Sequence, residues 1–416
     1  MIWRSLLSIA LAALVLSACG ASGGDPPAPI ATRLCPQSID YDTVFTGGAG
    51  SGELVQVQVD TTAMTYKITY LASPVPVTTG TVSPTRSSAP NNVVSGTLTQ
   101  ETLLPAAKLN ECAFRLNNAS LDATRPARVF LGEGVLGGTI PGAEISFDGV
   151  AGVGVVPDTT FPYYPFIAFA QTSTSLADIA GKYSMLGYHK VPSQNFAPVG
   201  IDASFTINAD GSFTECDNRG LYAGQCRQSG TNFVARTDSP TFETAHFTGQ
   251  VAPTQAVNGP QAQGILIVGK LRGQLVPILI RVGAADPSIF SPPGSPPKTP
   301  LADDESGIAM LAPQANVALG LQNGEYVGVD SNFAYRTTAL MNAQATMLDP
   351  FNAAQASLAT ALDLDYTQAL PGLVTTTKGM AGTMPTGKMI FTGGTIGYLD
   401  TSDPSAPYFA VSAFVQ

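Results

Sequence analysis

Charged side chains are scarce in this chain of 416 residues, and their scarcity argues against one large class of function. Only 12% of the residues are charged, compared with the ~25% typical of soluble domains. Acidic residues outnumber basic ones by 30 to 20, and the net charge is −10. Nucleic-acid-binding proteins present a basic patch or a recognisable module. This sequence has neither, so we expect no nucleic-acid partner.

Residues that bind metals or perform acid–base catalysis are also few. There are two histidines, His189 and His246, and the cysteine spacings do not fit a zinc site. We interpret both histidines as hydrogen-bonded structural residues, because neither has a catalytic partner at a defined spacing. The glycine pattern of residues 132–137 matches a dinucleotide fingerprint, but strand and turn residues follow it where a helix is needed. We expect no metal, no cofactor and no catalytic residue.

A long apolar segment that could span a membrane is missing as well. The apolar run behind Arg4 is about 14 residues long, whereas a spanning helix needs roughly 20. A basic start, an apolar run and small residues at its end predict a secretory signal peptide over residues 1–18. Leu16 to Cys19, "LSAC", resemble the lipobox of bacterial lipoproteins. In this region the chain is similar to outer-membrane lipoproteins of Gram-negative bacteria.

This resemblance implies a location and a modification. Cys19 would become the first residue of the mature protein and carry acyl chains such as palmitate, and two or more chains anchor a protein stably. Gly20 replaces the Asp that retains lipoproteins at the inner membrane, so the resemblance implies an outer-membrane anchor in the cell envelope. Whether the protein faces the periplasm or the cell surface stays open. Residues 19–34, rich in Gly, Ser and Pro, are expected to form a flexible tether.

Four cysteines remain once Cys19 is assigned to the lipid. An even number in an oxidising compartment predicts two disulfides, for which three pairings exist. We favour Cys216 with Cys226, as a local staple of a loop. Cys35 with Cys112 would then tie the start of the folded chain to its first domain.

Alternating apolar residues predict β structure over most of the chain. Residues 54–59 and 64–70 alternate around a turn and predict a hairpin. We expect a mainly β fold of two or three antiparallel sandwich- or barrel-like units. Our boundaries are 35–173, 174–284 and 306–416, with a Pro-rich linker over 285–305 whose acidic end, residues 303–305, is interpreted as a solvated loop. One short helix is predicted near 350–362.

The candidate ligand contacts are aromatic residues flanked by proline, which can stack on sugars or dock on a partner. They are Phe161, Tyr163, Tyr164, Phe166 and Tyr408. Few titratable residues and no intact catalytic motif favour a non-enzymatic binding or structural protein of the envelope, with a glycan or an envelope protein as partner. The alternative is an envelope glycan hydrolase that uses Asp363 and Asp365 as its acid/base pair. A scaffold for envelope assembly is a third hypothesis.

Overall fold

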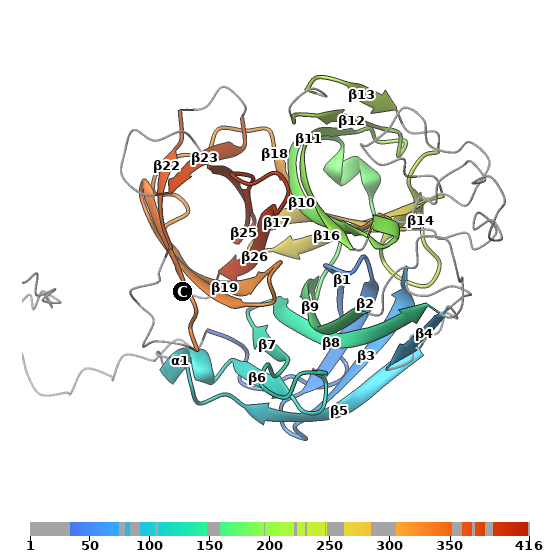
Figure 1. Cartoon of the computed structure of the whole chain (residues 1–416), viewed down its shortest axis with the longest axis vertical. Coiled ribbons are helices and arrows are strands. Elements are labelled where there is room, and N and C mark those ends of the chain that lie inside the picture. Colours follow the sequence, from blue (N-terminus) through green and yellow to red (C-terminus); the bar gives the residue numbers. More distant parts are fainter. Residues whose placement is uncertain are drawn as a thin grey trace, which may run out of the picture. The chain divides into compact units, whose positions relative to one another are not determined.

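Strands make up almost all of the secondary structure in the computed structural model of the chain (Figure 1). The structure describes residues 34–74, 80–83, 92–104, 107–147, 159–194, 196–219, 223–228, 231–245, 247, 262–283, 305–351, 360–367, 371–378 and 386–414. Within these residues the strands form two closed barrels and one open sheet, and all strand pairs are antiparallel. The predicted mainly β fold with barrel-like units is therefore confirmed.

The first barrel uses the N-terminal third of the chain. Its eight strands close through the β8–β9 pairing, and a further short strand, β4, extends β8 at one edge. The elements are β1 (Phe45–Ala49), β2 (Leu54–Asp60), β3 (Thr65–Ala72), β4 (Gly80–Ser83), β5 (Asn92–Gln100), α1 (Ala107–Asn110), β6 (Ala113–Leu116), β7 (Arg128–Leu131), β8 (Val135–Phe147) and β9 (Thr159–Phe169).

The second sheet is open, and its order is β13-β12-β11-β10-β18-β17-β16-β15-β14. β18 pairs with β17, which precedes it in the chain, and with the distant β10. Residues 306–313, predicted as part of the third unit, are thus a central strand here. The elements are η1 (Leu176–Ile179), β10 (Gly181–Val191), η2 (Pro192–Gln194), β11 (Ala197–Ile207), β12 (Phe213–Asp217), β13 (Cys226–Gln228), β14 (Val234–Ala235), β15 (Phe242–Thr244), β16 (Gln263–Leu271), β17 (Gln274–Val282) and β18 (Ser306–Pro313).

The C-terminal barrel is an eight-stranded meander in which each strand pairs with the next and β26 returns to β19. Thr360–Leu362, the end of the predicted helix, belong to strand β22, and residues 352–359 lie outside the described residues. The strands are β19 (Gly324–Asp330), β20 (Tyr335–Met341), β21 (Gln344–Leu348), β22 (Thr360–Asp365), β23 (Leu373–Lys378), β24 (Gly387–Thr392), β25 (Thr395–Asp400) and β26 (Tyr408–Phe414).

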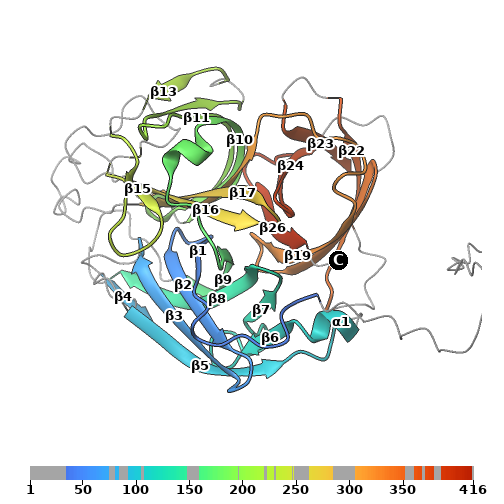
Figure 2. The same ribbon diagram turned by 180° about the vertical axis from the view of Figure 1, so that it is seen from behind.

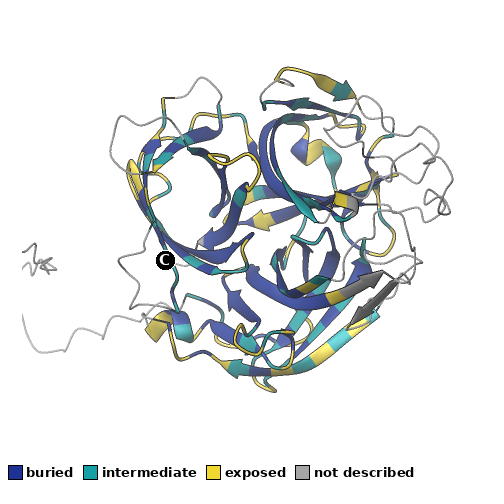
Figure 3. Ribbon diagram, viewed as in Figure 1, coloured by how far each residue is buried: buried dark blue, intermediate teal, exposed yellow. Residues whose placement is uncertain are grey.

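The burial pattern of the strands follows from their surroundings (Figure 3). In β2 the side chains of Val55, Val57 and Val59 are buried and alternate with half-buried polar ones, because one face of a barrel strand fills the interior. In β16 the run Ile265–Val268 is buried on both faces. One face contacts the first and third sheets, and the other packs under β10 and β11. A strand covered on both faces has a continuous apolar run.

All three sheets share one apolar cluster. It includes Phe169 of β9, Ile267 of β16 and Ile390 of β24. Figures 1 and 2 show the first barrel against β16 and β17 from opposite sides. Residues 33–416 therefore pack as one unit.

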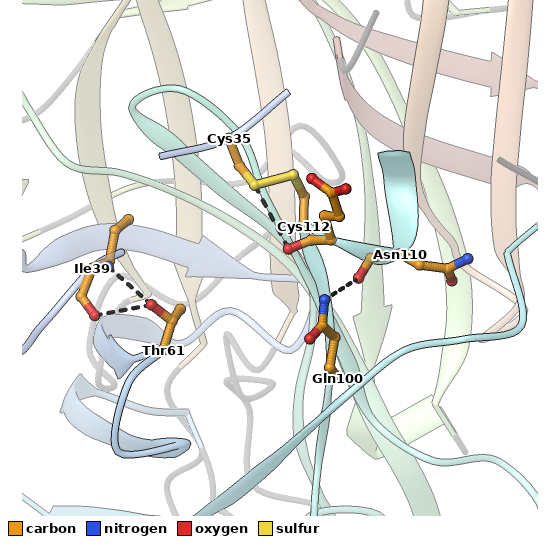
Figure 4. The surroundings of a disulfide bond; sticks show 7 residues. Cys35, Ile39, Thr61, Gln100, Asn110 and Cys112 are labelled. Carbon is orange, nitrogen blue, oxygen red and sulfur yellow. Dashed lines mark hydrogen bonds between the residues drawn. A yellow bond between two sulfur atoms is a disulfide. The ribbon is translucent and has the colours of Figure 1, made fainter. Parts of the chain in front are cut away.

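Both disulfides of the favoured pairing are present. Cys35 is joined to Cys112 just after α1, across 77 positions of sequence, and Cys216 is joined to Cys226 across 10 (Figure 4 shows the first). Cys216 and Cys226 face each other as a cross-strand pair of β12 and β13. In the chain-entropy view the longer loop contributes more to stability, about 4.5 against about 2.7 kcal/mol.

Candidate ligand-binding site in the C-terminal barrel

The interior of the C-terminal barrel is apolar at one end and polar at the other. The apolar end is filled by a cluster of buried side chains that includes Leu340, Leu362 and Phe391. Every second side chain of a strand points into the barrel. Toward the other end of the barrel, these inward-facing side chains become charged. In β20 the inward row runs from Leu340 back to Arg336, and in β25 it runs from Ile396 to Asp400.

A cavity of about 270 Å³ opens at this polar end. It lies where β20 begins and where β23 and β25 end, so that residues distant in sequence share its wall. The lining residues are mostly polar, with a few apolar or aromatic side chains among them: Asn332, Arg336, Met347, Thr360, Lys378, Tyr398, Asp400, Ser402, Ala406 and Tyr408.

The first charged pair of the cavity is Arg336 with Asp330. The guanidinium donates from Nε to Asp330 Oδ2 over 2.7 Å. The Asp330 side chain has no exposed surface, and its Oδ1 also accepts the backbone N–H groups of Asn332 and Ala334. Burial alone would lower the pKa of Arg336, but the neighbouring Asp330 carboxylate raises it above its ordinary value. The cation lies nearer to solvent than its partner.

The second charged pair is Lys378 with Asp400. The ammonium donates to Asp400 Oδ2, and the backbone N–H of Ser402 donates to Oδ1 over 2.9 Å. Burial acts to raise the pKa of Asp400, yet the hydrogen bonds from Lys378 and Ser402 lower it below its usual value. Here too the carboxylate is buried, with 4% of its side chain exposed, while Lys378 keeps 42%. Asp400 therefore stays ionised at neutral pH, and both carboxylates are held by donors from the protein.

Two tyrosines, Tyr398 and Tyr408, line the cavity beside these pairs. The rings of Tyr398 and Tyr408 meet edge to face, with 5.9 Å between centroids, and burial raises the pKa of both phenols well above the usual value. Tyr408 contacts Arg336 and Asp330. The Tyr398 hydroxyl is buried and interacts with the side chains of Asp400, Thr376 and Thr386.

This arrangement does not favour general acid catalysis. A general acid at neutral pH needs a carboxyl whose pKa is raised, whereas the pKa of Asp400 is lowered by its donors. Among the residues that the structure describes, no group of three or more His, Cys, Asp or Glu side chains is arranged to hold a metal ion. The geometry fits recognition of a small polar molecule.

The five predicted aromatic contacts separate into two groups. Tyr408 lines the cavity. The other four are buried in β9 within the core of the first barrel, where Phe161 packs on Phe196 and Phe333, and Tyr163 donates a hydrogen bond to the carbonyl of Phe333. Their burial leaves Phe161, Tyr163, Tyr164 and Phe166 with 1–6% exposure, so these side chains stabilise the core and offer little surface to a ligand.

His189 is buried and hydrogen-bonded, and its partner corrects the interpretation of Glu305; residues 303 and 304 lie outside the described residues. Nδ1 of His189 lies 2.6 Å from Oε1 of Glu305, and both side chains are buried. Glu305 was expected in a solvated loop, but it is buried immediately before β18, beside the buried Arg281, which donates to its carbonyl. His246 lies outside the described residues.

The carboxylates of the hydrolase alternative face away from the cavity. Asp363 and Asp365 alternate with the buried Leu362 and Leu364 of β22, so both point to the outside of the barrel. Asp365 accepts hydrogen bonds from the backbone N–H and the hydroxyl of Thr367. They share a face, as the spacing predicted, but no lining residue of the cavity stands with them.

Sequence reasoning missed most of the cavity. Arg336, Lys378, Tyr398 and Asp400 were not among the candidates. One signal was present: Tyr398 and Asp400 are two residues apart at the end of an alternating strand, as are Thr376 and Lys378. A polar pair that ends an inward row marks a barrel opening, but only the strand order shows that these rows meet.

Comparisons with known proteins give one family model and one solved structure. No helix in the described part of the chain is long and apolar enough to span a membrane. No curated protein matches the sequence. A solved structure described as "The Structure of Intact Ap-TbpB (N and C lobes)" matches over 87% of this chain with 10% identity and a TM-score of 0.18. The chain spans just under two thirds, 66%, of that structure. A family model described as "Protein of unknown function (DUF2957)" matches residues 65–413, and the chain therefore belongs to this family.

Proposed function

We propose that this protein is a non-enzymatic binding protein of the bacterial envelope that takes a small ligand into the mouth of its C-terminal barrel. The observation that carries the proposal is the cavity itself, whose wall gathers Arg336, Lys378 and Asp400 from three strands at the polar end of the barrel. Ligand pockets combine a concave wall with a few convergent polar groups. The two ion pairs and Tyr408 supply such groups here.

Two features support binding over catalysis. Asp400, the carboxylate that lines the cavity, has a lowered pKa and is held by protein donors, so it is not available as a general acid. The charged pairs are also fixed before a ligand arrives, because each carboxylate is buried and anchored to backbone N–H groups. Groups that are already ordered lose less entropy on binding.

The location is part of the same proposal. We infer from the lipobox-like residues Leu16 to Cys19 that the chain is anchored by lipid at Cys19 to the outer membrane, with residues 19–34 as a tether. A tethered protein with a preformed cavity would capture its ligand at the envelope.

Native mass spectrometry of the full-length chain, purified from its own bacterium in mild detergent, tests the binding site. We expect a bound small molecule that dissociates on activation. Tyr398→Phe, which removes only the hydroxyl, and Asp400→Asn, which breaks the Lys378 pair, should lower its occupancy at least tenfold.

Asp363→Asn on the outer face of the same barrel is the matched control and should retain the ligand. The proposal fails if the wild-type chain carries no small molecule, or if both cavity variants retain it as the control does. Chemical conversion of the released molecule by the wild-type chain would instead favour an enzyme.

A further inference from the structure

The charges around the cavity cancel. Two cations, Arg336 and Lys378, face two carboxylates, Asp330 and Asp400, and each cation is paired within the protein. An anionic ligand would have to compete with a buried carboxylate for each cation, and a cationic ligand would meet carboxylates already engaged by N–H donors. A site without net charge favours a neutral ligand, because a charged one would lose its hydration without compensation.

The cavity nevertheless offers donors and acceptors side by side. In each pair a cationic donor lies beside a carboxylate. Arg336, Lys378 and Asp400 line the cavity, and the buried Asp330 lies behind Arg336. Hydroxyl groups of Tyr398, Thr360 and Ser402 and the amide of Asn332 complete the lining. A ligand hydroxyl donates one hydrogen bond and accepts others, so it suits a wall in which the two kinds of group alternate. Several hydroxyls on adjacent carbons would satisfy this wall best.

The size of the cavity and its apolar surface limit the class of ligand further. At about 270 Å³ the cavity is slightly smaller than the roughly 300–1,000 Å³ of pockets for drug-sized ligands. Part of its wall is apolar: the ring of Tyr408, the Met347 side chain and Ala406. A ligand with a hydroxylated edge and a C–H face would use both kinds of surface.

Resting on the proposed function, we propose that the ligand is a neutral saccharide, with one sugar ring in the cavity. Its hydroxyls would contact Arg336 and the Lys378–Asp400 pair, while its C–H face would lie against Tyr408. The cavity would thus distinguish sugars by charge as well as by shape.

Ligand-observed NMR with the full-length chain tests the class. The probes are the neutral sugars glucose, galactose and N-acetylglucosamine, the anions glucuronate and inorganic phosphate, and the cation glucosamine. We expect at least one neutral sugar to bind and the charged probes to bind at least tenfold more weakly. Tyr398→Phe should weaken the neutral sugar at least tenfold. Asp363→Asn should leave its affinity unchanged, and the thermal melting of each variant shows that it folds.

Two outcomes overturn the saccharide assignment and leave the proposed function intact. One is tighter binding of glucuronate, phosphate or glucosamine than of any neutral sugar. The other is a failure of all neutral sugars at about 50 mM, where binding in the mM range is detectable, while the native mass spectrum still shows a ligand sensitive to Tyr398→Phe. If neither experiment shows binding at the cavity, the proposed function fails with it.

Discussion

At the scale of single residues, His189 and Glu305 form a pair in which both side chains are buried. Burial acts to raise the pKa of Glu305, but the positive Arg281 and the hydrogen bond from His189 lower it to about 2. Burial lowers the pKa of His189, so the imidazole is neutral at pH 7 and donates from Nδ1 to the ionised carboxylate. Breaking such a pair leaves buried polar groups without compensation.

Glu305→Gln is therefore expected to destabilise the fold by about 3 kcal/mol at pH 7. The folded pKa of Glu305, about 2, is below its ordinary 4.5, so its ionisation stabilises the fold above about pH 4.5, and this contribution is lost as the pH falls toward 2. The difference between wild type and variant should shrink over that interval. Urea unfolding at pH 7 and near pH 3 measures it. Glu133→Gln at an exposed site is the control, and an equal difference at both pH values would contradict the linkage.

The misplacement of Glu305 shows what the sequence could not reveal at this scale. An acidic run at the end of a Pro-rich segment has the pattern of a solvated loop. The partner that makes burial favourable, His189, is 116 residues away. His189 itself was correctly interpreted as hydrogen-bonded, because a buried imidazole needs only one partner, whichever residue supplies it.

At the scale of elements, closure of the C-terminal barrel depends on a close approach of its first and last strands. Gly328 of β19 lies opposite Ser412 of β26. A Cβ atom at position 328 would be 1.8 Å from the carbonyl oxygen of Val411 and 2.4 Å from the hydroxyl of Ser412. Only glycine fits there, and a shift of either strand would alter the polar rows that end in the cavity.

Gly328→Ala should destabilise the protein by about 2 kcal/mol, because the added methyl group meets backbone that cannot move aside. Gly137→Ala in β8 of the first barrel is the matched control, since no atom lies within 4 Å of a Cβ there. Thermal unfolding of the two variants against wild type makes the comparison. Equal melting temperatures for Gly328→Ala and wild type would show that β19 and β26 separate easily.

Elements were easier to predict than the site they form. The hairpin of β2 and β3 follows from alternation within 17 contiguous residues, and the structure pairs Val57 with Ile68 as that pattern requires. The cavity depends on three strands, β20, β23 and β25, whose polar ends meet only because the barrel closes. Tyr408 was a candidate because it belongs to an aromatic cluster flanked by proline, which is visible in the sequence alone. The sequence alone does not indicate the roles of Arg336, Lys378 and Asp400, because each role depends on a partner in another strand.

At the scale of the whole molecule, the disulfide Cys35–Cys112 fixes the place where the predicted tether meets the folded chain. Sγ of Cys35 also lies 3.8 Å from the carbonyl oxygen of Glu111, and Gln100 donates to the carbonyl of Asn110 beside it (Figure 4). The segment that would connect to a lipid at Cys19 is thus covalently joined to the first barrel, and a pull on the tether would act on that barrel first.

The proposed anchor predicts a change of location for Cys19→Ser. The wild-type chain should incorporate labelled palmitate and sediment with outer membranes, because multiple acyl chains bind stably. The variant should lose the label and leave the membrane fraction. Cys226→Ser is the control, since it removes a cysteine far from the lipobox. Protease treatment of intact cells then tells the cell surface from the periplasm, and palmitate on the Cys19→Ser variant would contradict the anchor.

The position of β18 has a consequence for how the chain matures. β10 and β17 both pair with a strand that begins at Ser306. While the nascent chain is shorter than that, the edges of both strands have unpaired backbone groups, and such edges promote aggregation. The second sheet therefore stays incomplete until about three quarters of the protein has been made. Holding chaperones are therefore expected to cover the edges of β10 and β17 until β18 has been made.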